Sequence, residues 1–334
     1  MPGEIAVLVN PAARGGRSRE LLGPVLHRLR RGGAEVSVIV GESAADALTR
    51  ARTAVAAGAG TLVAFGGDGL VHLAVQAVAG TGVPLGIVPA GTGNDIAAAL
   101  GLTGRSPVAA ADVVLGGGLR AVDAARTGDG EWFAGVLACG FDSRVNERAN
   151  RMTWPPGMAR YLLALAEELR SFRPIPFRIT LDGPEGPEVI EREAMLVAVG
   201  NTSSYGAGMR VCPDAVADDG LLDVTILGAV SKGRFLRVFP QVYRGAHVAH
   251  PFVATGRARR ITLEAPGVVA YADGERLGPT PLTCEIVPGA LRVLVPAASG
   301  PGSPDLSGPG ARRGEPESNV PAESAPDGPE SRYR

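Results

Sequence analysis

Residues 61–79 read TLVAFGGDGLVHLAVQAVA, a stretch that changes character twice. Residues 61–65 are a short apolar run, residues 66–69 are the turn Gly-Gly-Asp-Gly, and residues 70–79 are apolar again but long enough for a helix. The short run predicts a strand buried on both faces, and the longer stretch predicts a helix. A buried strand that passes through a glycine turn into a helix is typical of parallel α/β sheets.

The same strand-to-helix unit recurs on both sides of this stretch. We expect strands at 4–10, 35–40 and 85–88, and helices at 18–31, 44–58 and 94–100. Apolar strands that are each followed by a helix predict a parallel sheet covered on both faces. The first part of the chain, residues 1–127, is therefore predicted to be a doubly wound α/β domain. Its ligand should lie beyond the carboxyl ends of the strands.

The pattern of the second half differs, because few helices interrupt its strands. Strands are expected at 132–138, 177–181, 193–199, 222–227, 259–263, 268–272, 283–287 and 291–295. The helices expected there are an amphipathic one at 157–172 and one at 231–244 that Pro240 breaks. These signals predict a β-rich, sandwich-like domain at 128–296. Residues 297–334 contain few apolar side chains, so we expect a disordered tail.

Composition excludes several classes of function. The formal net charge is −1, which gives no support to nucleic-acid binding. Lys232 is the only lysine, so a phosphate site would have to use arginine, backbone N–H groups or a metal ion. Cys139, Cys212 and Cys284 lie far apart, which argues against a zinc site or a disulfide framework and favours a reducing compartment, the cytoplasm.

The sequence shows neither a signal peptide at its start nor an apolar run long enough to span a bilayer. If the ligand of this chain is a lipid, the protein is expected to visit the membrane surface transiently, as a peripheral protein on the cytoplasmic side. The oligomeric state is left open, a homo-oligomer included.

Three glycine-bearing loops follow predicted strands and precede predicted helices: NPAARGGRS at 10–18, GGDG at 66–69 and PAGTGND at 89–95. Glycine allows close approach of the backbone to a ligand, and a helix N-terminus presents free N–H groups to an anion. One such loop is weak evidence, but three at one sheet edge predict an anion site. Asp68 would repel a polyphosphate unless a cation or a ribose lies between them, which indicates a magnesium nucleotide.

These three loops, in this order, resemble the nucleotide domain of the diacylglycerol kinase catalytic family, which includes sphingosine kinases and bacterial lipid kinases. PDAVADDGLLD at 213–223 resembles the metal loop of that family, and ADGE at 272–275 resembles its catalytic turn. The resemblance covers about residues 5–295. It implies an ATP-dependent lipid kinase that phosphorylates a lipid hydroxyl, most often converting diacylglycerol to phosphatidic acid in phospholipid metabolism.

The resemblance also implies roles for single residues. Glu275 would be the general base, and Asp68, Asp95 and Asp123 would form an acidic network that reaches the water of the metal. Mg²⁺ would be bound by the side chain of Asp219 and the carbonyl groups of Val216 and Leu221, hard oxygen ligands of the kind it prefers. The residues implied to line the ATP site are Asn10, Pro11, Ala12, Ala13, Arg14, Gly41, Gly66, Gly67, Asp68, Gly69, Leu70, Val71, His72 and Thr92.

The chain departs from the family pattern beside the second loop. Members usually read Gly-Gly-Asp-Gly-Thr, with Asn-Glu two residues later, where this chain has Leu70, His72 and Leu73. Gly41 stands where a threonine is common. These changes remove two hydroxyls and a carboxylate but leave the backbone cradle for phosphate. His72 is interpreted as a packing or hydrogen-bonding residue rather than an acid–base catalyst.

Three alternatives remain at this point. The chain could be a kinase for a sphingoid base or another lipid, an NAD kinase-like enzyme that shares the GGDG turn, or a non-catalytic lipid- or nucleotide-binding protein. Retention of Asp219 and Glu275 favours an enzyme, because a binding protein needs no base. Arginines on the two helices of the second domain either contact anionic lipid or form ordinary solvated faces: Arg160, Arg170, Arg173, Arg234, Arg237 and Arg244.

Overall fold

A computed structural model describes residues 3–10, 17–155 and 158–297. The expected tail from residue 298 onward lies outside the described residues, as do Pro11, Ala12, Ala13 and Arg14 of the first loop. In the part of the chain that is described, no helix is long and apolar enough to cross a membrane.

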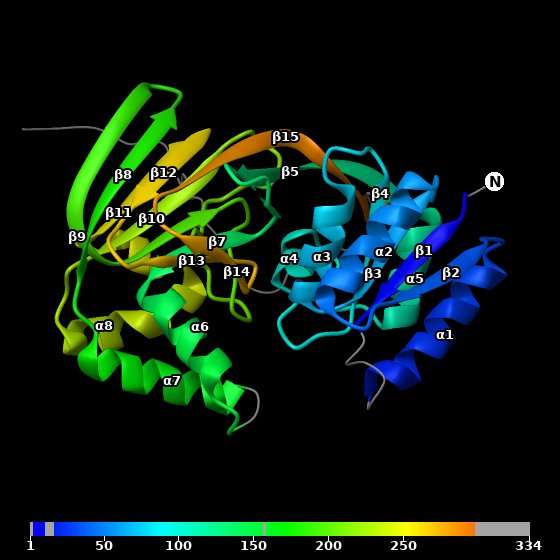
Figure 1. Cartoon of the computed structure of the whole chain (residues 1–334), viewed down its shortest axis with the longest axis horizontal. Helices are drawn as coiled ribbons and strands as arrows, with labels where there is room; N and C mark the ends of the chain where they lie inside the picture. Colours follow the sequence, from blue (N-terminus) through cyan, green and yellow to red (C-terminus); the bar gives the residue numbers. More distant parts are fainter. Residues whose placement is uncertain (1–2, 11–16, 156–157, 298–334) are drawn as a thin grey trace, which may run out of the picture. The chain divides into compact units, whose positions relative to one another are not determined.

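The first half forms the predicted parallel sheet. Its strands are β1 (Ile5–Val9), β2 (Val36–Val40), β3 (Thr61–Gly66) and β4 (Pro84–Pro89), in the order β2-β1-β3-β4 (Figure 1). The helices are α1 (Arg17–Arg31), α2 (Ala44–Ala56), α3 (Asp68–Val78), α4 (Asp95–Ala99) and α5 (Pro107–Gly116).

Helices cover both faces of this sheet, as the alternation along β1 shows. Ile5, Val7 and Val9 belong to one buried cluster, which also contains side chains of α1 and α5. Ala6 and Leu8 belong to another, with side chains of α2 and α3. Because successive side chains of a strand point to opposite faces, each face has its own hydrophobic layer. The predicted doubly wound α/β domain is confirmed.

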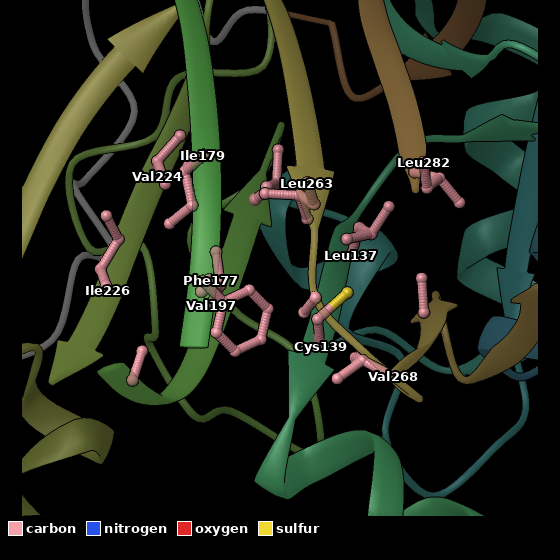
Figure 2. Packing of buried hydrophobic residues seen from close by; sticks show 14 of the residues in the cluster. Leu137, Cys139, Phe177, Ile179, Val197, Val224, Ile226, Leu263, Val268 and Leu282 are labelled. Atoms are coloured by element: carbon pink, nitrogen blue, oxygen red, sulfur yellow. The ribbon is translucent and has the colours of Figure 1, made fainter. Parts of the chain in front are cut away.

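The second half is β-rich, as predicted. Its strands are β6 (Trp132–Phe133), β7 (Val136–Gly140), β8 (Ile175–Gly183), β9 (Gly186–Gly200), β10 (Leu222–Gly228), β11 (Val253–Ala258), β12 (Arg260–Glu264), β13 (Val269–Ala272) and β14 (Glu275–Pro279). These strands pair antiparallel, in an order that includes β14-β13-β7-β9-β8-β12. Figure 2 shows side chains of Leu137, Phe177, Val197 and Leu263 in the hydrophobic layer of this sheet.

Helices of the second half include the two that were predicted. The amphipathic helix is α7 (Met158–Ser171), and the other splits into α8 (Lys232–Val238) and the 3₁₀ helix η2 (Phe239–Arg244), with a further 3₁₀ turn η3 (Ala246–Ala249). The break at Pro240 is confirmed, since α8 ends two residues before it.

Helix α6 (Phe141–Arg151), helix α5 and strand β5 (Gly118–Thr127) were not predicted. For the two helices, signals were present in the sequence. Phe141, Val145 and Ala149 are buried at helical spacing, and Ser106 caps α5 by accepting a hydrogen bond from Ala109 N–H at 3.2 Å.

One long strand, β15 (Leu282–Val295), replaces the two strands expected at 283–287 and 291–295. Its first residues pair antiparallel with β12, and Arg292 and Val293 pair parallel with β4. Strand β5 runs antiparallel along most of β15. The end of the β-rich half therefore completes the sheet of the α/β half, and both halves belong to one compact unit that extends to Ala297.

Candidate active site

The second and third glycine loops meet at the carboxyl ends of β3 and β4. A Cβ atom added at Gly91 would lie 2.5 Å from the Cα atom of Gly67, and one added at Gly67 would lie 3.2 Å from the Cα atom of Gly91. Real Cβ atoms essentially never approach backbone as closely as 2.5 Å, so Gly91 needs to be glycine for the loops to touch, and a side chain at Gly67 would be tightly crowded. The prediction of a shared sheet edge is thereby confirmed for the second and third loops, while most of the first loop lies outside the described residues.

Asp68 and Asp95 come close together beside these loops. A Cβ atom added at Gly93 would lie 2.8 Å from Asp68 Oδ2 and 3.4 Å from Asp95 Oδ2. Burial raises the pKa of Asp68, and the negative charge of Asp95 adds to this rise, although a hydrogen bond from Ile96 N–H at 3.2 Å opposes it. Two carboxylates so placed favour a cation or a shared proton nearby.

Asp95 also fixes a loop of the second half. Its Oδ2 and Oδ1 atoms accept hydrogen bonds from the N–H groups of Ala207 and Gly208, both at 2.7 Å. The hydrogen bonds to a buried carboxylate are stronger than those between neutral groups. The third glycine loop is therefore tied to residues more than a hundred positions away.

Asp123, on β5, holds the predicted metal loop. The side chain is almost fully buried, and its two oxygens accept hydrogen bonds from Gly220 N–H and Gly289 N–H, each at 2.7 Å. Its own N–H group donates to the carbonyl of Ala217 at 2.8 Å. The structure thus brings Asp68 and Asp95 together and places Asp123 under the loop that contains Asp219.

The predicted metal ligands lie at the surface of that loop. The side chain of Asp219 forms an ion pair with Arg257 and accepts a hydrogen bond from Leu221 N–H at 3.1 Å. Val216 is exposed. Among the described residues, no three His, Cys, Asp or Glu side chains form a metal-binding group. One carboxylate and two backbone carbonyls suit a magnesium ion whose other ligands are water molecules and phosphate oxygens of a substrate. Arg257 competes with such an ion for the carboxylate of Asp219.

The predicted catalytic turn is a two-residue hairpin between β13 and β14. Asp273 and Gly274 have φ angles of 54° and 87°, the left-handed conformation that Asp-Gly favours in such turns. Glu275 follows directly and faces the GGDG turn, because a Cβ atom added at Gly69 would lie 3.0 Å from its Oε1 atom. The fold therefore sets the predicted base beside the predicted phosphate loop.

Two buried residues of this region received no role from the sequence. Asp273 stood inside the ADGE motif, where a turn residue is expected to face water. Instead its carboxylate is buried and accepts hydrogen bonds from Gly135 N–H at 2.9 Å and Ala134 N–H at 3.2 Å. Gln76, one helical turn after His72, is buried as well.

His72 is buried between these two residues. Its Nδ1 atom lies 3.2 Å from Asp273 Oδ2, and its Nε2 atom lies 3.1 Å from the side-chain nitrogen of Gln76. Burial lowers the pKa of His72, but the hydrogen bond and the charge of Asp273, together with the charges of Glu275 and Glu131, raise that pKa by more. His72 therefore joins the helix after the GGDG turn to the hairpin that carries Glu275.

Several predicted ATP-site residues serve packing. The side chains of Leu70 and Val71 are buried in the layer shared with α2, so only their backbone could face a nucleotide. A Cβ atom added at Gly41 would lie 2.5 Å from the backbone nitrogen of Ala47, so a threonine would not fit there with α2 in place. Asn10 and Thr92 are exposed.

A cleft of about 500 Å³ lies beside these loops and is lined by both polar and apolar side chains. Asp68, Thr92 and Asp95 are among its polar residues, and Leu162, Leu165 and Phe239 are among its apolar residues. This volume is in the range of small-molecule sites. A mostly apolar cavity of about 60 Å³ has several lining residues in common with the cleft: Asp142, Tyr161, Leu165, Tyr205, Met209 and Phe239.

Asp142, which the sequence did not single out, stands where the cleft and the cavity adjoin. Its carboxylate accepts hydrogen bonds from Tyr161 Oη at 2.7 Å and Asn146 Nδ2 at 3.1 Å. Burial raises the pKa of Asp142, and the hydrogen bonds from Tyr161, Tyr205 and Asn146 oppose that rise. Asp142 thus lines the apolar cavity with its carboxylate already hydrogen-bonded to Tyr161 and Asn146.

Comparison with known proteins agrees with this arrangement. Residues 4–127 match the family model for the diacylglycerol kinase catalytic domain, and residues 135–295 match that for the YegS C-terminal NAD kinase beta sandwich-like domain. A protein named diacylglycerol kinase from Mycobacterium tuberculosis is 44% identical over 298 residues, which are 88% of this chain and 96% of the relative.

A second relative, named probable lipid kinase YegS-like, comes from Pseudomonas aeruginosa and is 32% identical over 81% of this chain and 88% of its own. The solved structure of a putative diacylglycerol kinase from Bacillus anthracis has the same fold, with a TM-score of 0.70 at 24% identity over 87% of this chain and 97% of that one. The chain therefore belongs to the diacylglycerol kinase family of lipid kinases.

Proposed function

We propose that this chain transfers the γ-phosphate of ATP to the free hydroxyl of diacylglycerol, which yields phosphatidic acid for phospholipid metabolism. The observation that carries the proposal is the approach of Glu275 to the GGDG turn, where a Cβ atom at Gly69 would lie 3.0 Å from Glu275 Oε1. The adjoining cleft is lined by polar residues of these loops and by apolar side chains of the second half, a combination that suits a lipid with a polar end. The names of the relatives support the choice of lipid.

In the proposed reaction Glu275 is the general base. A lipid alcohol is a poor nucleophile at neutral pH, so its proton must be taken as its oxygen attacks. The new bond joins that oxygen to the γ-phosphorus, the bond from the γ-phosphorus to the bridging oxygen breaks, and ADP leaves with the electron pair. Glu275 receives the proton and then releases it to solvent.

The loops of the first half would bind the nucleotide. The N-terminus of α3, which begins at Asp68, offers N–H groups to phosphate. A magnesium ion held by Asp219 and the carbonyl groups of Val216 and Leu221 would neutralise phosphate charge. Asp123 accepts a hydrogen bond from Gly220 N–H in the same loop and would thereby help to hold these ligands in place.

The second half would bind the lipid. Leu162, Leu165 and Phe239 would contact the acyl chains near the head group. The small cavity behind Asp142, about 60 Å³, is well below the size of a typical ligand site, so acyl chains would enter it only after the surrounding side chains move.

The test is a phosphorylation assay with labelled ATP and separate acceptors: diacylglycerol, a sphingoid base, a different neutral lipid alcohol and NAD. We expect label in phosphatidic acid. If the label appears in another lipid or in NAD, that molecule is the substrate and diacylglycerol is not. If no acceptor is labelled, the protein is a non-catalytic binding protein.

Replacing Asp219 with asparagine should raise the magnesium concentration that half-saturates turnover by at least about tenfold, because a charged ligand is lost. The matched control is Asp218→Asn in the same loop, since Asp218 pairs with Arg120 at 2.7 Å instead. Magnesium titrations of both variants provide the measurement. If Asp219→Asn keeps the wild-type dependence, Asp219 lies outside the metal site.

We propose that the protein binds peripherally and transiently to the inner surface of the membrane. Large exposed apolar side chains occur on or next to the helices of the second half: Trp154, Leu162, Leu163, Leu236 and Tyr243. Leu162 and Tyr243 also line the cleft, so an apolar surface continues from the exterior into the proposed lipid site. Exposed arginines accompany these residues and suit anionic lipid: Arg170, Arg173, Arg234, Arg237 and Arg244.

Leu162→Asp should weaken binding to anionic vesicles by about tenfold or more, because an apolar contact of roughly 1.5–3 kcal/mol is replaced by a repelled charge. Val189→Asp is the control, since Val189 is similarly exposed but lies on β9. Vesicle sedimentation at several salt concentrations measures both, and salt should weaken binding. Equal losses for the two variants would contradict the proposed surface.

A further inference from the structure

A buried chain of hydrogen bonds connects helix α3 with the hairpin that carries Glu275. It runs from the backbone of Trp132 through Gln76 and His72 to Asp273. His72, Gln76 and Asp273 are each at most 9% exposed. The proposed reaction, as described so far, gives His72 and Gln76 no part.

The direction of each hydrogen bond follows from the backbone at one end. Trp132 N–H donates to Gln76 Oε1 at 3.0 Å, and the side-chain nitrogen of Gln76 donates to the Trp132 carbonyl. This pair fixes the orientation of the amide, so its NH₂ group faces His72 Nε2. Nε2 must then accept, which leaves the proton on Nδ1, and the Nδ1–H group donates to Asp273.

Asp273 is the residue through which this chain can affect Glu275. Its backbone is left-handed, a conformation that is uncommon outside glycine and is held here by the hydrogen bonds of its carboxylate. A Cβ atom at Gly135 would lie 2.5 Å from Asp273 Oδ1, so the carboxylate is closely confined on that side. On the other side it is His72 that fixes its position. Because Glu275 lies two residues further along a tight hairpin, a shift of Asp273 would move it.

We propose that His72 is a positioning residue for phosphoryl transfer. As the Nδ1–H tautomer selected by Gln76, it anchors Asp273 to the helix that begins at the GGDG turn and so sets the distance from Glu275 to the phosphate loop. This rests on the proposed function, since it takes Glu275 as the base. The resemblance implied that His72 lines the ATP site, but its ring is buried between Gln76 and Asp273, so the role proposed here acts through Asp273 and not through contact with a nucleotide.

Two substitutions of similar polarity separate this role from simple packing. In His72→Asn the amide nitrogen takes about the place of Nδ1 and keeps the donor to Asp273. In His72→Gln the amide takes about the place of Nε2, keeps the contact with Gln76 and loses Asp273. We expect His72→Asn to keep kcat within a few-fold of wild type. His72→Gln should lower kcat by roughly 10- to 100-fold with KM for ATP and lipid little changed, because small misplacements of a reacting group have effects of this size.

Melting temperatures of both variants are measured alongside, to show that each is folded. Equal kcat values for folded His72→Asn and His72→Gln would overturn the proposal, and so would a loss confined to KM. A wild-type protein that phosphorylates no acceptor would instead overturn the proposed function.

A ¹⁵N NMR measurement on the wild type tests the hydrogen bonds independently of activity. The chain has 4 histidines, so loss of one signal in His72→Asn assigns the ring. At mildly alkaline pH we expect a protonated Nδ1 and an unprotonated Nε2. The opposite tautomer would overturn the inference even if the enzyme is an active kinase.

Discussion

Replacing Glu275 with glutamine is expected to lower turnover by about 10²- to 10⁴-fold, the usual contribution of a general base. The amide keeps the shape of the side chain but cannot take the proton of the lipid hydroxyl. Glu275 is exposed at the start of β14, so its substitution should change the free energy of unfolding by no more than about 0.5 kcal/mol. ATP affinity should also stay near that of wild type, because the loss arises in the transition state.

Turnover, melting temperature and ATP affinity are measured on one preparation of this variant. Glu188→Gln is the matched control, since Glu188 is exposed on β9. A Glu275→Gln protein that keeps most of its turnover would remove Glu275 as the base, and with it the main residue-level support for a kinase rather than a binding protein.

Replacing Asp123 with asparagine, which also changes a carboxylate to an amide, is expected to lower mainly the free energy of unfolding. Asp123 accepts hydrogen bonds from Gly220 N–H and Gly289 N–H, and an amide can accept only one of them while its NH₂ group opposes the other. Losing a hydrogen bond to a buried charge and leaving an N–H unpaired should reduce the free energy of unfolding by about 2–4 kcal/mol. The melting temperature should fall by roughly 5–15 °C.

Thermal unfolding of Asp123→Asn is compared with that of Asp129→Asn, an exposed aspartate in the turn after β5. We expect the control to unfold like the wild type. Asp123 also supports the metal loop, so its variant should need more magnesium. An Asp123→Asn protein of wild-type stability would show that the two glycine N–H groups do not depend on this carboxylate.

Much of the fold could be predicted from the sequence, because its signals are local. Apolar runs such as 61–65 are long enough for a strand and too short for a helix, and each ends at a glycine turn. Helix α6 shows where such an interpretation fails: Phe141, Val145 and Ala149 have helical spacing, but polar residues surround them. Strand β5 is partly amphipathic, and its place is decided by pairing with β15, far along the chain.

Some features of the candidate site could likewise be predicted from the sequence, and others could not. The GGDG turn and the ADGE hairpin were evident as motifs, because both depend on residues that adopt unusual backbone conformations locally. The sequence could not show that Leu70 is buried, that Gly41 leaves room for Ala47, or that His72 meets Asp273. Each of these depends on which atoms another element brings within a few ångströms.

Local sequence patterns were therefore enough to predict most of the strands and helices in their order, the parallel α/β half, the β-rich half and the motifs that indicate a lipid kinase. Hydrophobic spacing and glycine turns act over a few residues, so they can be interpreted without knowing the fold. Only the tertiary structure decided that β15 pairs with β4, that Asp95 and Asp123 fasten distant loops, and that Glu275 faces Gly69. These contacts join residues that lie between 97 and 208 positions apart along the chain. Hydrogen bonds and close packing over such separations arise only once the strands between them have paired.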